Sequence, residues 1–372
     1  MASKLSDVKI ILDVQKPVAE VNLGELAIFM PASATGYKSY TDLETLEDEI
    51  TDKEVLAVAK GFFAQDEHCK NLDVVSYSDA AAAIDQYFDA GWEFATIAGT
   101  KPTATTPTEP ADSGSGDDGD GTATTPAPTP APTSAADDGL TISNYIEGKG
   151  QRFYVEGLAG TKETVDSAAD LSKKYEGNEH TILFAAGADA EDSAYAVGAL
   201  IGAIANQTVG SVTWKFKTLT GVDTCDFTAA QVNTLHTAGI FTYVNKAGID
   251  QTSEGITVTG EYIDALHGDD WVKDTMQAKL QNLLSTEKKI SYDVAGIAQI
   301  SAVAQSVLMT ATTNGIVLVN PDTAAGEFTV TTTSRAETPL ADIIARAYNG
   351  LSFTYERSGA IHSVTVHGTV TM

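Results

Sequence analysis

The fold class is decided by the stretch TILFAAGADAEDSAYAVGALIGAIA, residues 181–205. Four of its first five residues, 182–185, are apolar, which indicates a short strand buried inside a sheet. Residues 192–205 then have the length and composition of a buried helix. A buried strand followed closely by a buried helix is typical of an α/β fold.

The same alternation continues on both sides of this stretch. Upstream, apolar strand-like runs at residues 26–30, 74–77 and 94–98 alternate with helical patterns at 44–63 and 80–90. Further patterns predict strands at residues 152–155, 212–219, 240–245 and 256–263 and a helix at 228–238. In the run at 212–219, Trp214 and Phe216 alternate with Lys215 and Lys217, as in a strand with one buried face.

The last third of the chain has a different character, because helices and a hairpin replace the alternation. Helical spacing of apolar residues predicts helices at residues 270–284 and 295–313. A third helix is expected to open at Thr338-Pro339 and to stop at Gly350. The sequence pattern that follows predicts a hairpin of residues 351–357 and 361–370 around a Ser358-Gly359 turn. The predicted fold is therefore α/β, followed by an α+β C-terminal domain.

Residues 100–139 interrupt the α/β pattern. They contain no Ile, Leu, Val, Met or aromatic residue and hold seven of the eleven prolines, so they cannot build a core. We predict a solvent-exposed insertion, either a tolerated loop or a surface decoration. The predicted domains are a strand arm at 1–20, an α/β domain at 21–99 and 140–250, and a C-terminal domain at 251–372 that ends in a second arm.

The charge of the chain excludes several kinds of partner. It carries 51 Asp and Glu against 23 Lys and Arg, a formal net charge of −28. No run of basic residues is longer than a pair such as Lys173-Lys174, so nucleic-acid binding is not expected. Residues 194–205, the longest near-apolar run, are too short to cross a bilayer, and no membrane insertion is expected. Residues 1–7 do not resemble a secretory signal, which predicts a cytoplasmic product.

The motifs of the main enzyme classes are missing from the sequence. Residues 157–163, GLAGTKE, have the wrong spacing for a phosphate-binding loop. His267 lies near Asp269 and Asp270, but capping of the helix before Trp271 explains the two aspartates more simply than a metal or acid–base site. The two cysteines, Cys69 and Cys225, form no CxxC pair and are expected to be small core residues. We therefore expect no catalytic, cofactor-binding or metal-ligating residues and no cofactor.

Both ends of the chain have the alternation of strands. The candidate site residues lie on one face of each terminal pattern: Val8, Ile10, Leu12 and Val14 near the start, and Val364, Val366 and Val370 near the end. These strands either pair inside their own subunit or add to the sheets of neighbouring subunits. The pattern alone leaves both alternatives open.

The region from Gly255 to Val319 resembles the phage tail sheath family. The resemblance rests on four pieces in order: GITVTGEYID from Gly255, GDDW from Gly268, KISYDVAGI from Lys289 and NGIV from Asn314. It extends with lower specificity over residues 195–372. Its residues are of the kinds that pack and turn a chain, and none is catalytic.

This resemblance implies a non-enzymatic structural subunit that forms sixfold rings stacked helically around a tail tube. It places residues 255–372 near the tube, the α/β region outside, and the terminal arms between rings. Contraction would drive the tube through a target envelope, in a virion tail or a bacteriocin-like particle assembled in the bacterial cytoplasm. The implied partners are further copies of the chain, the tail tube protein, and the baseplate and tail terminator proteins. Two alternatives remain at this point: an acidic α/β enzyme of unknown class, and a cell-surface binding module.

Overall fold

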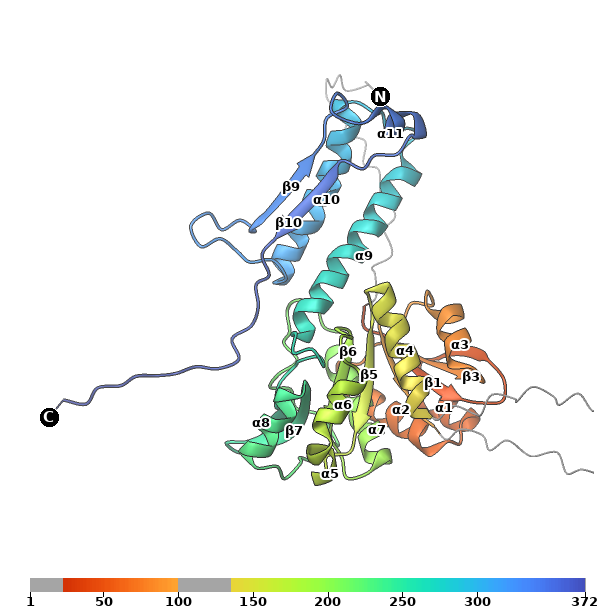
Figure 1. Ribbon diagram of the computed structural model, residues 1–372, viewed down its shortest axis with the longest axis vertical. Helices are drawn as coiled ribbons and strands as arrows, with labels where there is room; N and C mark the ends of the chain where they lie inside the picture. Colours follow the sequence, from red (N-terminus) through yellow and green to blue (C-terminus); the bar gives the residue numbers. More distant parts are fainter. Residues whose placement is uncertain (1–22, 100–134, 372) are drawn as a thin grey trace, which may run out of the picture. The chain divides into compact units, whose positions relative to one another are not determined.

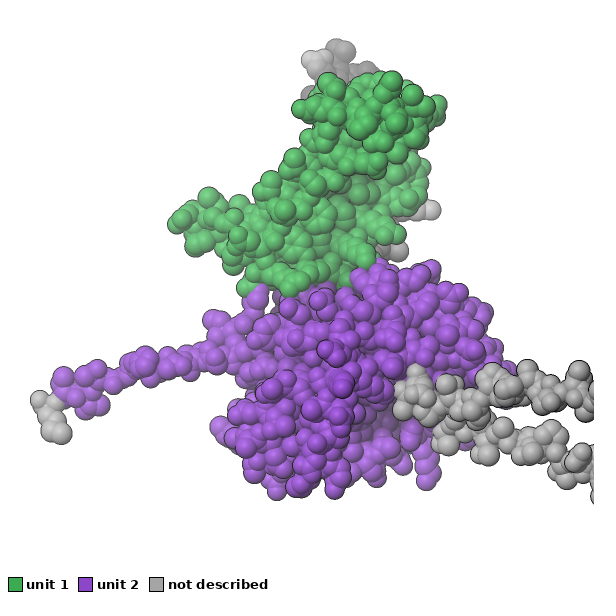
Figure 2. Space-filling model, viewed as in Figure 1, with its two compact units in different colours: residues 1–21, 269–358 green, residues 22–268, 359–372 purple. Residues whose placement is uncertain are grey.

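The computed structural model describes residues 23–99 and 135–371, which form two compact units (Figures 1 and 2). Of these residues, unit 1 contains 269–358, and unit 2 contains 23–268 together with the C-terminal tail from 359. The predicted N-terminal arm with Val8, Ile10, Leu12 and Val14 lies outside the described residues, as does residue range 100–134 of the predicted insertion. The tail after Ser358 therefore groups with unit 2, although the sequence-based division assigned it to the C-terminal domain.

Unit 2 is built on an eight-stranded sheet with the order β2-β3-β1-β4-β5-β6-β7-β8. Its strands are β1 (Leu26–Pro31), β2 (Gly36–Tyr40), β3 (Leu72–Tyr77), β4 (Phe94–Ile97), β5 (Phe153–Leu158), β6 (Thr181–Ala185), β7 (Ile240–Lys246) and β8 (Ile249–Thr252). The six inner strands are parallel, and the two edge strands are antiparallel to their neighbours. All five residues of β6 are buried, as expected for a strand covered on both faces.

Helices cover both faces of this sheet (Figure 1). On one face lie α1 (Leu43–Glu49), α2 (Lys53–Phe63) and α7 (Ala190–Ile204). On the other lie α3 (Ala80–Tyr87), α4 (Ala135–Lys149), α5 (Lys162–Asp166), α6 (Ala168–Lys174) and α8 (Ala229–Thr237). The alternation of strands and helices makes a three-layer α/β unit, which confirms the predicted fold class.

Three sequence predictions in unit 2 need correction at the level of single elements. The helix predicted at 44–63 is two helices, because Asp52 accepts hydrogen bonds from the backbone N–H groups of Glu54 and Val55 and starts α2 anew. Helix α4 was not predicted, and it begins inside the predicted insertion 100–139. Its Ile142 and Ile146, four residues apart, are fully buried. The third correction concerns the strands predicted at 212–219 and 256–263.

Residues 212–219 form an irregular segment, because Phe216 adopts a left-handed backbone conformation with φ 66°. A regular strand cannot pass through that conformation. The segment still follows the end of β8, since the N–H of Phe216 donates to the carbonyl of Thr252 over 3.2 Å. Residues 256–262 make only a single bridge between Ile256 and Tyr262, and the next helix begins directly at Ile263.

Unit 1 combines helices with a two-stranded antiparallel sheet. Its elements are the C-terminal part of α9 (Ile263–Thr286), then α10 (Val294–Asn314), β9 (Phe328–Thr332), α11 (Leu340–Ala345) and β10 (Leu351–Tyr355). Helix α10 packs against both strands. The predicted hairpin of 351–357 with 361–370 is wrong, since β10 pairs with β9 instead. The partner strand, β9, precedes α11 in the chain, and turn signals in the sequence do not reveal a pairing between strands that far apart.

The residues that carry the family resemblance have structural roles at the ends of α10. Asp293 caps its N-terminus by accepting from the N–H of Gly296 over 3.0 Å. A Cβ atom at Gly296 would lie 1.9 Å from the carbonyl oxygen of Ser291, so only glycine fits there. Gly315 ends the helix in a left-handed conformation with φ 89°. These residues start and stop one helix.

The two aspartates near His267 do not cap a helix, contrary to the prediction, because α9 starts at Ile263 and contains both. Asp269 instead pairs with Arg357 and accepts from the hydroxyl of Tyr355. This pair joins α9 to the end of β10 within unit 1. The error came from placing the helix start at residue 270 instead of 263.

Candidate functional site

The C-terminal tail carries the strand pattern predicted for an assembly arm. Residues 359–371 contain no regular secondary structure and pair with no strand of the described chain. Val364, Val366 and Val370 are 78%, 85% and 93% exposed. Isolated exposed valines are ordinary, but three on one face of an extended segment form an unpartnered apolar edge. The choice between pairing inside the subunit and pairing with another copy stays a prediction.

His362 is the one residue of this tail that is not exposed, and it occupies a socket in unit 2. Its Nδ1 lies 2.6 Å from a carboxylate oxygen of Glu254, and its Nε2 lies 2.8 Å from the hydroxyl of Thr213. The ring of Tyr262 packs edge-on against the imidazole at a centroid distance of 4.9 Å. Only 11% of the His362 side chain is exposed.

Charged groups behind the imidazole complete this socket. The second carboxylate oxygen of Glu254 accepts from the ammonium group of Lys215 over 2.7 Å, and both side chains are largely buried. Burial raises the pKa of Asp264, while the charge of His362 and a hydrogen bond from Thr213 act in the opposite direction. The socket therefore places one basic residue and two carboxyl groups around the histidine.

Three segments build the socket, and each is fixed by the core beneath it. Thr252 accepts from the N–H of Lys217 and donates its hydroxyl to the carbonyl of Trp214 over 2.7 Å, which holds residues 212–217 against the end of β8. Gly255 is needed next to Trp214, because a Cβ there would lie 2.5 Å from the tryptophan Cβ. Trp214 is 1% exposed and belongs to the core of unit 2.

The sequence analysis did not identify the socket residues as a site. Thr213 and Lys215 were assigned to a strand, and His362 and Glu254 were given no role. The sequence contained one weak signal, because His362 is a polar residue just before the alternating valines of the tail. The pairing of residues about 110 to 150 positions apart is set by the tertiary fold, so no local pattern could have predicted it.

The sheet of unit 1 offers open strand edges. It consists of β9 and β10 alone, so each strand has one side without a ladder partner in the described chain. Such edges carry free backbone N–H and C=O groups that can bond to an added strand. A two-stranded sheet is marginal by itself, and added strands would stabilise it.

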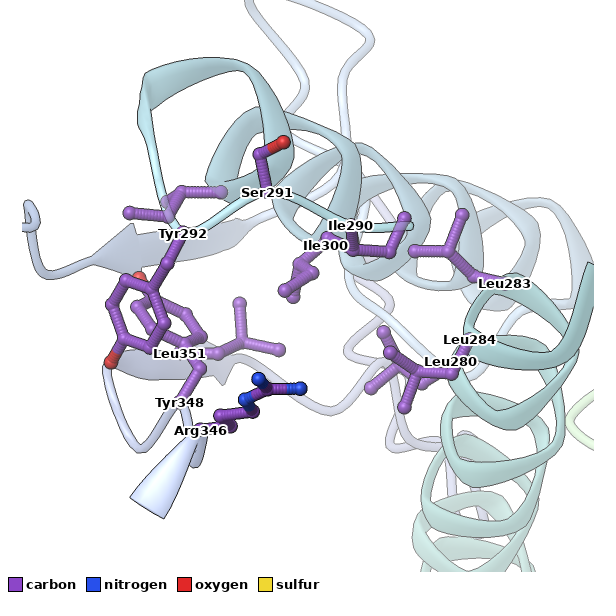
Figure 3. Close-up of a pocket in the computed structure, with 11 residues that line it drawn as sticks. Leu280, Leu283, Leu284, Ile290, Ser291, Tyr292, Ile300, Arg346, Tyr348 and Leu351 are labelled. Atoms are coloured by element: carbon purple, nitrogen blue, oxygen red, sulfur yellow. The ribbon is translucent and has the colours of Figure 1, made fainter. Parts of the chain in front are cut away.

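A small apolar cavity of about 280 Å³ also lies in unit 1. Figure 3 shows Leu280 and Leu284 on one side of this cavity and Tyr348 and Leu351 on the other, with the guanidinium of Arg346 between them. The lining is leucine, isoleucine and tyrosine with few polar groups, and it contains no arrangement of nucleophile and base. The cavity thus has the character of a packing gap next to exposed apolar residues of α11.

Helix α10 is unusual because none of its 21 residues is charged. It is long and apolar enough to span a membrane by length and composition, although only 33% of it is buried. Core helices of soluble proteins share this length and composition. Its buried residues, including Val307 and Leu308, pack within unit 1, and its outer face bears Gln299, Gln305 and Ser306. An uncharged outer face is compatible with a protein interface.

The titratable residues do not converge on a reaction centre in the part of the chain that the structure describes. No group of three or more His, Cys, Asp or Glu residues there could hold a metal ion. His267 is fully buried and binds the carbonyl of Leu23 over 2.7 Å, and burial lowers its pKa to about 4. Lys162 of the rejected phosphate-loop candidate pairs with Asp166 over 2.5 Å.

The fold of the chain matches several solved structures. The chain is similar over 100% of both chains to a chain in the six-fold symmetrised baseplate of the anti-feeding prophage, with a TM-score of 0.63 and 9% identity. It is also similar to a chain of the contracted sheath complex of an extracellular contractile injection system, PVC, with a TM-score of 0.64 and 10% identity over 99% of this chain and 98% of that one. A chain of the contracted anti-feeding prophage sheath gives 0.62 and 11% over 100% and 99%.

Identities this low establish a shared fold and no more. Residues 263–370 match the family described as E217 tail sheath protein gp31-like, C-terminal domain. The resemblance drawn from the sequence is confirmed there. No curated protein sequence matches the chain.

Proposed function

We propose that the chain is a non-enzymatic structural subunit of a contractile tail sheath, which polymerises around a tail tube and shortens to drive that tube through a target envelope. The observation that carries this proposal is the family match over residues 263–370. The fold shared with sheath chains over the whole length supports it. A sheath needs no cofactor, since the free energy comes from contacts between subunits that differ between two lattices.

The proposed assembly contacts are the two terminal arms. In this scheme Val364, Val366 and Val370 insert as a strand beside an open edge of β9 or β10 in another copy, and Val8, Ile10, Leu12 and Val14 do the same at the other end of the chain. Each backbone hydrogen bond contributes about 1 kcal/mol net, and burial of each valine adds about 1.5 kcal/mol or more. Several such bonds connect subunits while letting their folded units rotate.

The proposed partners and location follow from the same family. They are copies of the chain in sixfold rings, a tail tube protein, and baseplate and tail terminator proteins. Assembly would take place in the bacterial cytoplasm, and the product would be a virion tail or a bacteriocin-like particle. The net charge of −28 predicts that high salt favours polymerisation by screening repulsion between copies.

Paired substitutions in the C-terminal tail test this proposal. Val364→Asp with Val366→Asp places two charges on the apolar face, and Thr365→Asp with Thr369→Asp places the same charge on the opposite face. Electron microscopy of the purified chain, with and without tube protein, should give hollow tubes for the wild type, none for the valine variant, and shorter but recognisable tubes for the threonine variant. Normal tubes from the valine variant would refute the role of the tail.

A further inference from the structure

The tail contacts unit 2 through the side chain of His362. The chain leaves β10 at Tyr355, which belongs to unit 1, and the next residue that is not exposed is His362 in the socket of unit 2. Gly359 and Ile361 on one side and Ser363 on the other are exposed. His362 therefore separates a connecting segment from the strand-patterned residues that follow it.

The contacts of His362 differ from those of an incidental surface histidine. Both ring nitrogens have polar partners within 2.8 Å, and the ring lies against Tyr262. Its partner Glu254 is itself held by Lys215, so the acceptor is positioned before the imidazole binds. By contrast His367, five residues further on, is exposed. The 2.6 Å approach of Nδ1 to the Glu254 carboxylate and the burial of the ring restrain the tail at this residue.

We propose that Thr213, Glu254 and Tyr262 form a docking socket in which His362 acts as the positioning residue of the C-terminal arm. The socket fixes the point from which residues 363–370 leave the subunit. An extended strand rises about 3.3 Å per residue, so these eight residues reach about 26 Å from the socket. The anchor thereby limits which sheet edge, and hence which copy of the chain, the arm can join. This inference rests on the proposed function.

Loss of the anchor would lengthen the free tail. Without His362 in place the chain is free from Ser358, and the twelve residues up to Val370 reach about 40 Å. The volume that the arm explores grows with the cube of its length, so it becomes roughly three- to fourfold larger than with the anchor in place. The direction in which the arm leaves the subunit is also no longer fixed. Both changes lower the effective concentration of the strand at its acceptor edge.

The test compares His362→Ala with His367→Ala, which removes an exposed imidazole from the same tail. In the dilute monomer, methyl NMR of valine-labelled protein should show a broad Val364 signal in the wild type. In the His362→Ala protein that signal should sharpen toward the line width of Val370, while His367→Ala leaves it broad. His362→Gln, which can still donate to Glu254, should restore part of the broadening. The unfolding temperature reports separately on the folded units and should not change.

The second readout is the concentration at which tubes appear by electron microscopy. We expect His362→Ala to raise it about tenfold, Glu254→Gln to raise it less, and His367→Ala to change it less than twofold. Equal effects of the two alanine variants, or tubes from His362→Ala at the wild-type concentration, would overturn the inference. If the wild type forms no tubes even with tube protein, the proposed function fails, whereas the methyl signals still decide whether the socket holds His362.

Discussion

Replacing Gly198 by alanine should strongly destabilise unit 2, because α7 crosses α2 with backbone against backbone at this point. A Cβ atom built on Gly198 lies 1.9 Å from the carbonyl oxygen of Val58 and 3.0 Å from the backbone nitrogen of Phe62. Gly61 of α2 meets the carbonyl oxygen of Tyr195 in the same way, at 2.0 Å. Small residues on both helices therefore set the distance between them.

The size of the effect follows from how far the helices must move. A carbon and a carbonyl oxygen make contact at about 3.3 Å, so Gly198→Ala requires a separation of more than about 1 Å. A gap of that size forfeits a quarter to a half of the dispersion energy along the contact. Overpacking typically costs 1–3 kcal/mol, and backbone on both sides leaves no side chain to yield. We expect a loss of at least about 3 kcal/mol in the free energy of unfolding.

Urea unfolding followed by far-UV circular dichroism measures this loss. For a slope of about 3 kcal/mol/M, the midpoint should fall by roughly 1 M. Gly148→Ala is the matched control, because Gly148 lies in α4 and a Cβ there meets nothing within 4 Å. Alanine should raise stability there by about 0.5–1 kcal/mol. A Gly198→Ala midpoint equal to that of the wild type would refute the reasoning about backbone contact.

Three further predictions concern single side chains. Burial lowers the pKa of His267 to about 4, so as the pH drops the unfolded chain takes up a proton on this histidine before the folded chain does. The free energy of unfolding should therefore fall between about pH 6.5 and pH 4, by at most about 3 kcal/mol. Urea midpoints measured over this pH range should fall less for His267→Gln than for the wild type. Burial raises the pKa of the Cys69 thiol to about 12, so Ellman's reagent at pH 8 should modify Cys69 only after unfolding. The partly exposed Cys225 should react faster, and equal reaction rates of the two thiols in the folded protein would contradict this prediction. Asp293→Ala removes the cap of α10 and should cost about 1 kcal/mol in urea unfolding, and an unchanged midpoint would show that the cap is dispensable.

The sequence predicted elements well where one local rule decided the structure. The run at 181–185 became β6 with the same bounds, because its apolar residues 182–185 are buried in a strand that is covered on both faces. The helix predicted at 295–313 became α10 within one residue at each end, since Asp293 and Gly315 mark its start and stop. Prediction failed where a long-range contact overrode the local pattern, as at Phe216, whose left-handed conformation accompanies backbone bonds to Thr252.

By itself the sequence determined the α/β class, the likeness to tail sheaths over the C-terminal region, and the alternation of Val364, Val366 and Val370. Each of these depends on neighbours within one element or on order along the chain. Only the tertiary structure decided that β10 pairs with β9 and that the tail is held by His362 in a socket built from Thr213 and Glu254. Those contacts join residues distant in the chain, and many pairings are compatible with the same local patterns, so the packing of the whole subunit selects among them.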